Sequence, residues 1–373
     1  MKRVEAVTSA AMLASFIDFG YELYKDNSNY VPELFIAQRD LLTPGKHPFH
    51  EHSTVQCFIA YEDNKIIGRI AAILNNNHNS FNKANDGFFG FFDSINDDDT
   101  AVLLFDTAEK WLKEKGVDSI IGPVNLSTNE TCGLLIEGFD SPPVAMMTYN
   151  APYYKDLMEK KGFQKKVDLI AYNYVVEERD ERRLKTVDQI QERLAKRGIT
   201  FRTVNLKKFK EETDGIREIY NSAWDKNLGF VPMTEKEFKY LANDLKLILD
   251  KDFCVIAEHN GQMVGFSLSI PDINQIVKTI KKGRLFPTGI FKLLFKRKSI
   301  KRIRIITLGV IEGYRKMGIE TVFYADIIKQ VLKKGIRSAE ASWILEDNYL
   351  MNKAIQDING KAYKKYRIFE KSI

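Results

Sequence analysis

An internal repeat is the feature that most constrains how this 373-residue chain can fold. Residues 59–68 (IAYEDNKIIG) are echoed 197 positions later by residues 256–265 (IAEHNGQMVG). Each stretch has an apolar strand, a polar turn and a second apolar strand that reaches a glycine, which predicts a β-hairpin in both places. Residues 150–162 and 348–360 repeat in the same way at an offset of 198. This self-similarity indicates two copies of one folding unit.

The repeat also predicts the domain boundaries. Between the two matched regions the offset grows from 197 to 219, so the second copy carries an insertion of 22 residues, which falls in the basic segment 275–304. A compensating insertion in the first copy spans about residues 126–149. The charged stretch 177–197 has apolar residues on one helical face and is predicted to be a helical connector. The predicted lobes are therefore 1–176 and 198–373.

The order of elements in each copy predicts the fold class. Each copy contains a strand, one or two helices, a hairpin, a strand, a helix, a strand, a helix and a last strand. This order is typical of an α/β lobe with a mixed, mostly antiparallel sheet flanked by helices, and not of a doubly wound sheet. In the first copy we expect strands near 4–7, 55–62, 65–75, 87–93, 119–124 and 165–175, and helices near 9–25, 99–115 and 151–161.

Composition narrows the class of protein. Hydrophobic residues make up 44% and charged residues 28% of the chain, as in soluble globular proteins. Neither a leader peptide nor an apolar run of about 18 residues is found, so we expect a cytoplasmic protein. Cys57, Cys132 and Cys254 have no paired spacing, so neither a disulfide nor a metal site is expected.

A glycine-containing loop is the strongest candidate for a ligand site. Residues 308–320 (LGVIEGYRKMGIE) lead from an apolar strand into a helix, and a helix N-terminus with unpaired N–H groups favours bound phosphate. The loop resembles motif A of the GNAT superfamily of acyl-CoA N-acyltransferases, in which Q/R-x-x-G-x-G/A holds the CoA pyrophosphate. Arg315 and Gly318 match, whereas Glu320 stands where Gly or Ala is usual. The resemblance implies that CoA or acyl-CoA, as the acyl donor, contacts Leu308, Gly309, Val310, Arg315, Lys316, Met317, Gly318 and Ile319.

A second motif extends the resemblance. Strand 338–345, followed by Asn348 and a helix that ends at Gly360, is similar to GNAT motif B, whose asparagine faces the pantetheine arm. Two such lobes in one chain also occur in N-myristoyltransferases and Fem-type peptidoglycan transferases, so the resemblance implies two tandem GNAT-like lobes. Architecture alone does not identify a substrate.

The first copy lacks an equivalent phosphate site. At the offset of 219, the positions of residues 316–319 fall on Asp97, Asp98, Asp99 and Thr100. Carboxylates at these positions would repel phosphate, whereas they are favourable at the start of a helix. We therefore expect CoA to bind only the second lobe.

The resemblance implies that an amine attacks a thioester and that backbone N–H groups of residues 309–311 stabilise the oxyanion. The tyrosine that GNAT enzymes usually carry seven residues into the last helix is replaced by Ile355. His259 falls in a predicted hairpin turn and is expected to be solvated. Candidate catalytic side chains, each of which also fits a surface or capping role, are Tyr314, Glu346, Asp347 and Tyr349.

The two insertions are candidates for partner binding. The first mixes glycines with hydrogen-bonding residues, and its candidates for contact with the amine acceptor are Asn129, Glu130, Tyr149 and Asn150. The second lies between Asp272 and Glu312, a span without acidic residues that contains eleven lysines and arginines among apolar residues. This pattern predicts two short helices that dock on an anionic membrane or an acyl carrier protein, with a packed helical insertion as the alternative. Nucleic acid is not expected, because no base-reading module is apparent.

The leading interpretation is an acyltransferase that moves an acyl group from acyl-CoA, or from a carrier-bound thioester, to an amine. Two alternatives remain open. Glu320 and the replaced tyrosine favour a non-catalytic protein that binds CoA or lipid. The basic insertion favours an enzyme at the membrane surface that N-acylates a lipid with a long acyl chain.

Overall fold

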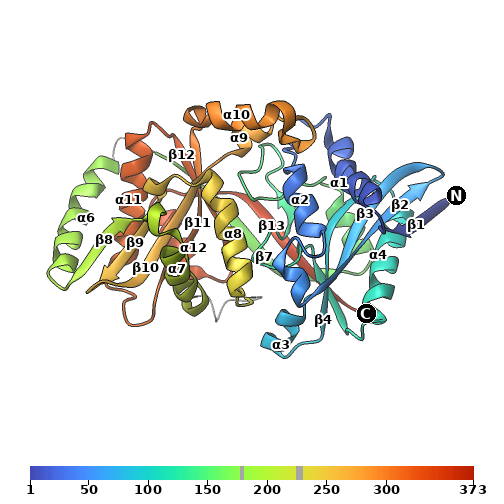
Figure 1. Cartoon of the computed structure of the whole chain (residues 1–373), viewed down its shortest axis with the longest axis horizontal. Coiled ribbons are helices and arrows are strands. Elements are labelled where there is room, and N and C mark those ends of the chain that lie inside the picture. Colours follow the sequence, from blue (N-terminus) through green and yellow to red (C-terminus); the bar gives the residue numbers. More distant parts are fainter. Residues whose placement is uncertain (177–179, 224–229) are drawn as a thin grey trace.

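A single twisted sheet forms the centre of the protein (Figure 1). The computed structural model describes residues 1–176, 180–223 and 230–373. Within these residues a 13-stranded sheet has the order β1-β2-β3-β4-β5-β13-β7-β12-β11-β10-β9-β8, with β6 paired to β13. The strands are β1 (Lys2–Ala6), β2 (Thr54–Glu62), β3 (Lys65–Leu74), β4 (Asp86–Ser94), β5 (Ser119–Gly122), β6 (Leu134–Glu137), β7 (Gln164–Val175), β8 (Ile199–Thr203), β9 (Cys254–His259), β10 (Gln262–Pro271), β11 (Arg302–Val310), β12 (Ser338–Leu345) and β13 (Lys361–Ser372).

Helices pack on the sheet in both halves, so the predicted class of two α/β lobes with mostly antiparallel strands is confirmed. The described helices are α1 (Ala10–Tyr24), α2 (Phe35–Leu42), α3 (Asn76–Asn82), α4 (Asp98–Lys113), α5 (Tyr154–Lys160), α6 (Asp180–Ala195), α7 (Phe209–Ala223), α8 (Glu235–Ile248), α9 (Asn274–Val277), α10 (Ile290–Phe295), α11 (Ile319–Lys333) and α12 (Tyr349–Asp357). The expected strands and helices of the first half are all present within a few residues, and α6 forms in the predicted connector.

The two hairpins that revealed the repeat have the predicted geometry. Strands β2 and β3 pair antiparallel, with Thr54 opposite Leu74 at one end and Glu62 opposite Lys65 at the turn. Strands β9 and β10 pair in the same antiparallel sense. At the second turn Asn260 and Gly261 both have positive φ, which a two-residue turn matched to the strand twist requires. Asparagine and glycine tolerate this conformation best, so the turn is encoded locally.

The final strands of the two halves are exchanged, which the sequence did not indicate. Strand β13, from the second copy, lies between β5 and β7 of the first, and β7 pairs antiparallel with β12 of the second. In Figure 1 the C-terminus consequently lies beside α4 of the first half. Residues 1–176 and 198–373 are thus two sequence repeats, but each half takes its last strand from the other.

Core packing follows the exchange. Phe369 of β13 is fully buried in a cluster with Phe89 of β4 and Phe105 of α4. Tyr366 and Ile368 of the same strand are buried in the neighbouring first-half cluster. The apolar core of the first half therefore depends on side chains from the end of the second.

The basic insertion folds as short helical pieces, in line with the prediction. It contains α9, α10 and several single turns between residues 281 and 299, of which one ends at Gly283 and the next contains Pro287. Its backbone packs against the first half, because a Cβ added to Gly283 would lie only 1.9 Å from the carbonyl oxygen of Glu33. Among the described residues, no helix is both long and apolar enough to cross a membrane.

Candidate functional site

A wedge-shaped opening separates β11 from β12 in the second half. The two strands pair in parallel only where residues 302–305 lie opposite residues 338–341. Beyond that point β11 remains paired with β10, and β12 remains paired with β7. The pairing of β11 with β10 shifts register at Leu268/Ser269, so Ile306 has no partner residue and forms a bulge at the point of divergence. A bulge beside diverging strands leaves backbone groups free to contact a ligand.

In the first half, contacts between β4 and the segment after β5 bridge the corresponding position. Strands β4 and β5 pair in parallel only over residues 86–88 and 119–121. The amide of Phe91 then donates to Oδ1 of Asn125 (2.8 Å), and the amide of Val124 donates to the carbonyl of Phe89 (2.7 Å). A Cβ on Gly90 would lie 2.5 Å from the carbonyl oxygen of Val124. These contacts bridge the first-half strands at the point where the second-half strands diverge.

The two helices that follow these strands also differ at their N-termini. Asp97 caps α4, accepting hydrogen bonds from the amide (2.7 Å) and hydroxyl (2.5 Å) of Thr100. The predicted role of Asp97 as a helix-start acid is therefore confirmed. Helix α11 begins after Gly318, which has φ +101° and supplies no side-chain cap. With Gly313 and Lys316 also at positive φ, the loop before α11 forms an open turn at an uncapped helix N-terminus.

The residues predicted to bind the cofactor fall into three groups. Leu308, Gly309 and Val310 lie at the end of β11, where Nε of Arg315 donates to the carbonyl of Val310 (3.0 Å). Lys316 is exposed, whereas Met317 and Ile319 pack into an apolar cluster with Val187 and Ile190 of α6. Asn348 is exposed and caps α12, accepting from the amide of Met351 (3.2 Å).

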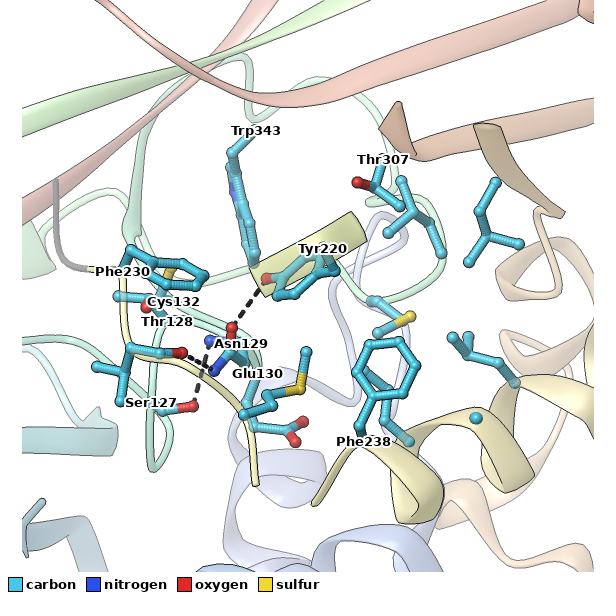
Figure 2. Close-up of a pocket in the computed structure, with 18 of the residues that line it drawn as sticks. Ser127, Thr128, Asn129, Glu130, Cys132, Tyr220, Phe230, Phe238, Thr307 and Trp343 are labelled. Carbon is cyan, nitrogen blue, oxygen red and sulfur yellow. Dashed lines mark hydrogen bonds between the residues drawn. The ribbon is translucent and has the colours of Figure 1, made fainter. Parts of the chain in front are cut away.

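A cavity of about 320 Å³ lies beside the wedge (Figure 2). It is bounded by α7, α8, β10, β11 and the loop 127–132 of the first half, so both halves contribute to it. Its walls are mostly apolar and include Phe209, Ile216, Phe238, Leu241, Leu245 and Phe266. Thr307 and Trp343, from the two diverging strands, join the lining and connect the cavity with the wedge.

Two polar groups in this lining lack hydrogen-bond partners. Within the part of the chain that the structure describes, Nε1 of Trp343 and Oγ1 of Thr307 are buried and unpaired. Arg304 lies over the Trp343 ring at 5.1 Å and donates to the carbonyls of Ala145 and Met146 (3.0 Å each). Because buried polar groups are nearly always paired, the indole and hydroxyl are available to a bound ligand.

The polar end of the cavity is built around the first insertion. The hydroxyl of Tyr220 donates to Oδ1 of Asn129 (2.9 Å), whose Nδ2 donates to the carbonyl of Val231 (3.1 Å). Beside them, burial raises the pKa of Glu130 to about 8, with further contributions from the carboxylates of Asp244 and Glu237. Glu130 is therefore a carboxyl group that titrates close to neutral pH.

His47, which like Glu130 belongs to the first half, lies next to that carboxyl group. Its Nε2 lies 3.7 Å from Oε1 of Glu130. The amide of Phe49 donates to Nδ1 (3.3 Å), so the proton of the neutral ring is assigned to Nε2, on the side of Glu130. Burial lowers the pKa of His47 to about 4, which keeps the ring neutral at pH 7. The His47 Nε2–H therefore lies beside the carboxyl group, at a distance longer than a hydrogen bond.

Asn129 and Glu130 were predicted as acceptor-site residues, and both line the cavity. The other two candidates lie outside this cavity. Asn150 is buried, accepting from the amide of Leu135 (2.7 Å) and donating to its carbonyl (3.1 Å). The hydroxyl of Tyr149 bonds to Asn27 and to the carbonyl of Phe139. Neither lines the apolar cavity.

The four predicted catalytic residues also lie outside the cavity lining. Glu346 pairs with Lys165 (2.6 Å) and accepts from the amide of Asp168 (3.0 Å). Asp347 and Tyr349 are exposed.

The fourth candidate, Tyr314, contacts His259, and the prediction that His259 is solvated was wrong. That histidine is half-buried at the end of β9 rather than solvated, and its Nδ1 bonds to the Tyr314 hydroxyl (2.8 Å). The expectation of a solvated ring failed because the loop before α11 folds back over the hairpin.

Sequence reasoning missed His47, Tyr220, Thr307 and Trp343. Trp343 carried a usable signal, because it lies in the strand of the motif-B match. The others had none, since their roles arise from the packing of distant segments.

These features define the class of protein as a tandem GNAT fold, and solved structures agree. A tandem GNAT protein from the clavulanic acid biosynthesis pathway is 10% identical with a TM-score of 0.59, covering 100% of this chain and 98% of that one. A GCN5-related N-acetyltransferase from Sphaerobacter thermophilus is 13% identical with a TM-score of 0.53, covering 100% and 95%. At these identities the likeness establishes the fold alone.

Two curated proteins are more similar in sequence. Protein YghO of Escherichia coli (strain K12) is 36% identical over 97% of this chain and 93% of its own. The bacterial ceramide synthase of Caulobacter vibrioides is 32% identical over 98% of this chain and 96% of its own. The chain belongs to the family that contains these two proteins. No protein-family model matches it.

Proposed function

We propose that the protein transfers an acyl group from an acyl thioester, with acyl-CoA as the donor, to the amine of a long-chain lipid. The observation that carries the proposal is the apolar cavity that joins the wedge between β11 and β12. Its volume lies in the range of ligand pockets, about 300–1,000 Å³, and its walls suit an alkyl chain. The name of the relative from C. vibrioides supports the same chemistry, because a ceramide is an N-acylated long-chain amino alcohol.

The open loop before α11 is the proposed site for the donor. Its positive-φ residues and the uncapped helix N-terminus offer backbone N–H groups to a pyrophosphate. Arg315 and Lys316 add positive charge, and both are exposed. The thioester then lies in the wedge, where backbone N–H groups near the Ile306 bulge stabilise the oxyanion.

Glu130 is the proposed proton acceptor. An ammonium group must lose a proton before its nitrogen can attack, and a carboxylate with a pKa near 8 is suited to accept it near neutral pH. The free amine then attacks the thioester carbonyl, the C–N bond forms and the C–S bond breaks. The attacking nitrogen loses one further proton and the leaving thiolate gains one, so the products are an amide and a thiol.

The direct test is an assay that mixes the purified protein with acyl-CoA and a long-chain amino alcohol. We expect CoA release and a new amide detected by mass spectrometry, and no product with a short-chain amine of the same headgroup. Saturable binding of both ligands without any product would instead support the second candidate, a non-catalytic protein that binds CoA or lipid.

A substitution at Gly318 tests the donor site. We expect Gly318→Val to weaken CoA binding at least about tenfold, because the residue has φ +101° and its Cβ would lie 3.0 Å from Ile190. Isothermal titration calorimetry measures the effect. Gly261→Ala is the matched control, since that glycine has φ +82° in a hairpin turn with no atom within 4 Å of an added Cβ. Equal losses in both variants would mean that backbone strain alone explains the effect.

Filling the cavity tests where the lipid chain binds. Ala242 of α8 lines the cavity, so Ala242→Phe is expected to shorten the longest chain that is accepted. Each methylene group that is excluded from the cavity costs about 0.8 kcal/mol of binding free energy. If the phenyl ring displaces two methylene groups, kcat/KM for the long substrate should fall about tenfold relative to that for a shorter one. Asn243→Phe, on the exposed side of α8, is the control. An unchanged chain-length profile in Ala242→Phe would place the alkyl chain elsewhere.

A further inference from the structure

The basic insertion carries a surface in which large apolar side chains project into solvent. The exposed fractions are 74% for Phe286, 57% for Phe291, 58% for Leu294 and 80% for Phe295. Residues 291, 294 and 295 have the i, i+3, i+4 spacing of one helical face, and the Phe291 and Phe295 rings stack with centroids 6.4 Å apart. Such a cluster of exposed apolar groups marks an interaction site.

Cations border this cluster on both sides along the chain. Lys278 and Lys281 precede it, whereas Lys296 and Lys298 follow it, and all four are exposed. In the described part of the chain, none of these four side chains has an ion pair or hydrogen bond. We call these four lysines and the four exposed apolar residues of the insertion the basic apolar surface.

The remaining cations of the insertion hold it in place. Arg284 pairs with Asp18 (2.8 Å) and lies over the Phe35 ring at 3.8 Å, and Lys282 pairs with Glu22 (2.6 Å). These contacts fix the insertion against α1 and α2. The four lysines without such contacts therefore lie on a segment that other residues hold against the protein.

The basic apolar surface adjoins the cavity at the C-terminal end of α8. Arg297 donates to the carbonyls of Ile248 (2.8 Å) and Leu249 (3.3 Å). Leu249 itself lines the cavity, and Leu247 is 75% exposed beside it. Figure 1 shows α10 along one edge of the molecule, above the junction of the two halves.

We propose that the basic apolar surface binds membranes that contain anionic lipids and brings the cavity to the bilayer. Exposed apolar side chains and exposed lysines on the same segment suit an interface, because apolar tips can enter the acyl region while lysines remain at headgroup level. An acidic carrier protein would satisfy the lysines but leave four large apolar side chains in water. The inference goes beyond acyl transfer, and it is tested by binding without turnover.

Sedimentation of the full-length protein with vesicles tests the proposal. We expect binding to vesicles of phosphatidylglycerol and phosphatidylcholine, weaker binding to pure phosphatidylcholine, and a loss as salt rises. Changing Lys278, Lys281, Lys296 and Lys298 to Gln is expected to weaken binding at least about tenfold, since each cation contributes independently. The control changes four exposed lysines elsewhere, Lys46, Lys65, Lys196 and Lys207, to Gln, and removes the same net charge.

A second variant separates general charge attraction from insertion. Phe291→Ser with Phe295→Ser keeps every cation, and because both side chains are exposed it should fold normally. We expect at least about a tenfold loss of vesicle binding from this pair. Three outcomes would overturn the proposal: no binding to anionic vesicles at low salt, equal losses in the two lysine variants, or binding to an acyl carrier protein but not to vesicles.

Discussion

Glu130→Gln is expected to lower the rate of amide formation by about 10²- to 10⁴-fold, the range for loss of a proton acceptor. The variant keeps the shape of the side chain but cannot accept the proton from the ammonium group. The wild-type rate should rise with pH to a plateau above about 8, the pKa of this carboxyl. In the variant the part of this rise that comes from Glu130 disappears. Only the pH dependence that comes from ionisation of the substrate amine remains.

The same substitution should stabilise the folded protein at high pH. Burial raises the pKa of Glu130 from its ordinary value of 4.5 to about 8. Between these values the folded state holds a proton that the unfolded state has released, so stability falls as pH rises through this window. Gln cannot ionise, so the Tm difference between variant and wild type should grow from pH 4.5 to 8 and then level off.

Glu137→Gln serves as the control, because Glu137 is exposed and pairs with Lys365 outside the cavity. It should change neither the rate nor the pH dependence of Tm. A variant at Glu130 that is more stable at pH 8 yet inactive cannot be explained by misfolding. Full activity of Glu130→Gln would remove this residue from the mechanism.

Separation of the two halves is expected to abolish folding. Residues 1–176 expressed alone lack β13, which supplies buried Tyr366, Ile368 and Phe369 to the first-half core. Burial of each stabilises by about 1.5–3 kcal/mol, and the sum is comparable with the total stability of a domain, about 5–15 kcal/mol. We expect an unfolded or insoluble product, measured by circular dichroism and thermal melting.

Co-expression of residues 1–176 with residues 177–373 provides the control, since both exchanged strands are then present and α6 is kept with the second-half core. We expect the two pieces to purify together and to melt in one transition. A cooperative melt of residues 1–176 alone would show that the first half does not require β13.

Much of the fold could be predicted because it is encoded locally. Hairpin turns such as Asn260–Gly261, the alternation of strands and the Asp97 cap each depend on a few neighbouring residues. The strand exchange could not be predicted in this way. The two copies end in similar strands, so sequence similarity is equally compatible with pairing in either half, and the choice depends on packing across the whole sheet.

The candidate site was predicted only in part for a related reason. The open loop before α11 is continuous in sequence, and the first insertion stood out as a long loop, so Arg315, Gly318, Asn129 and Glu130 could be named as candidates from the sequence. The cavity arises where α7 and α8 meet that insertion. Residues such as Tyr220 therefore acquire a role only through contacts across about a hundred positions of sequence.

The exchange of β7 and β13 has a consequence for biosynthesis. Strand β7 ends at Val175 and β13 spans Lys361–Ser372, so 185 residues separate the end of one from the start of the other. At about 5–20 residues per second, the ribosome needs roughly 10–40 seconds to synthesise that interval. During this time β5 and β7 of the nascent chain have no strand between them, and unpaired strand edges template aggregation. The first half is thus the earlier to be translated but cannot be completed before the second, so its sheet keeps unpaired strand edges until β13 has been made.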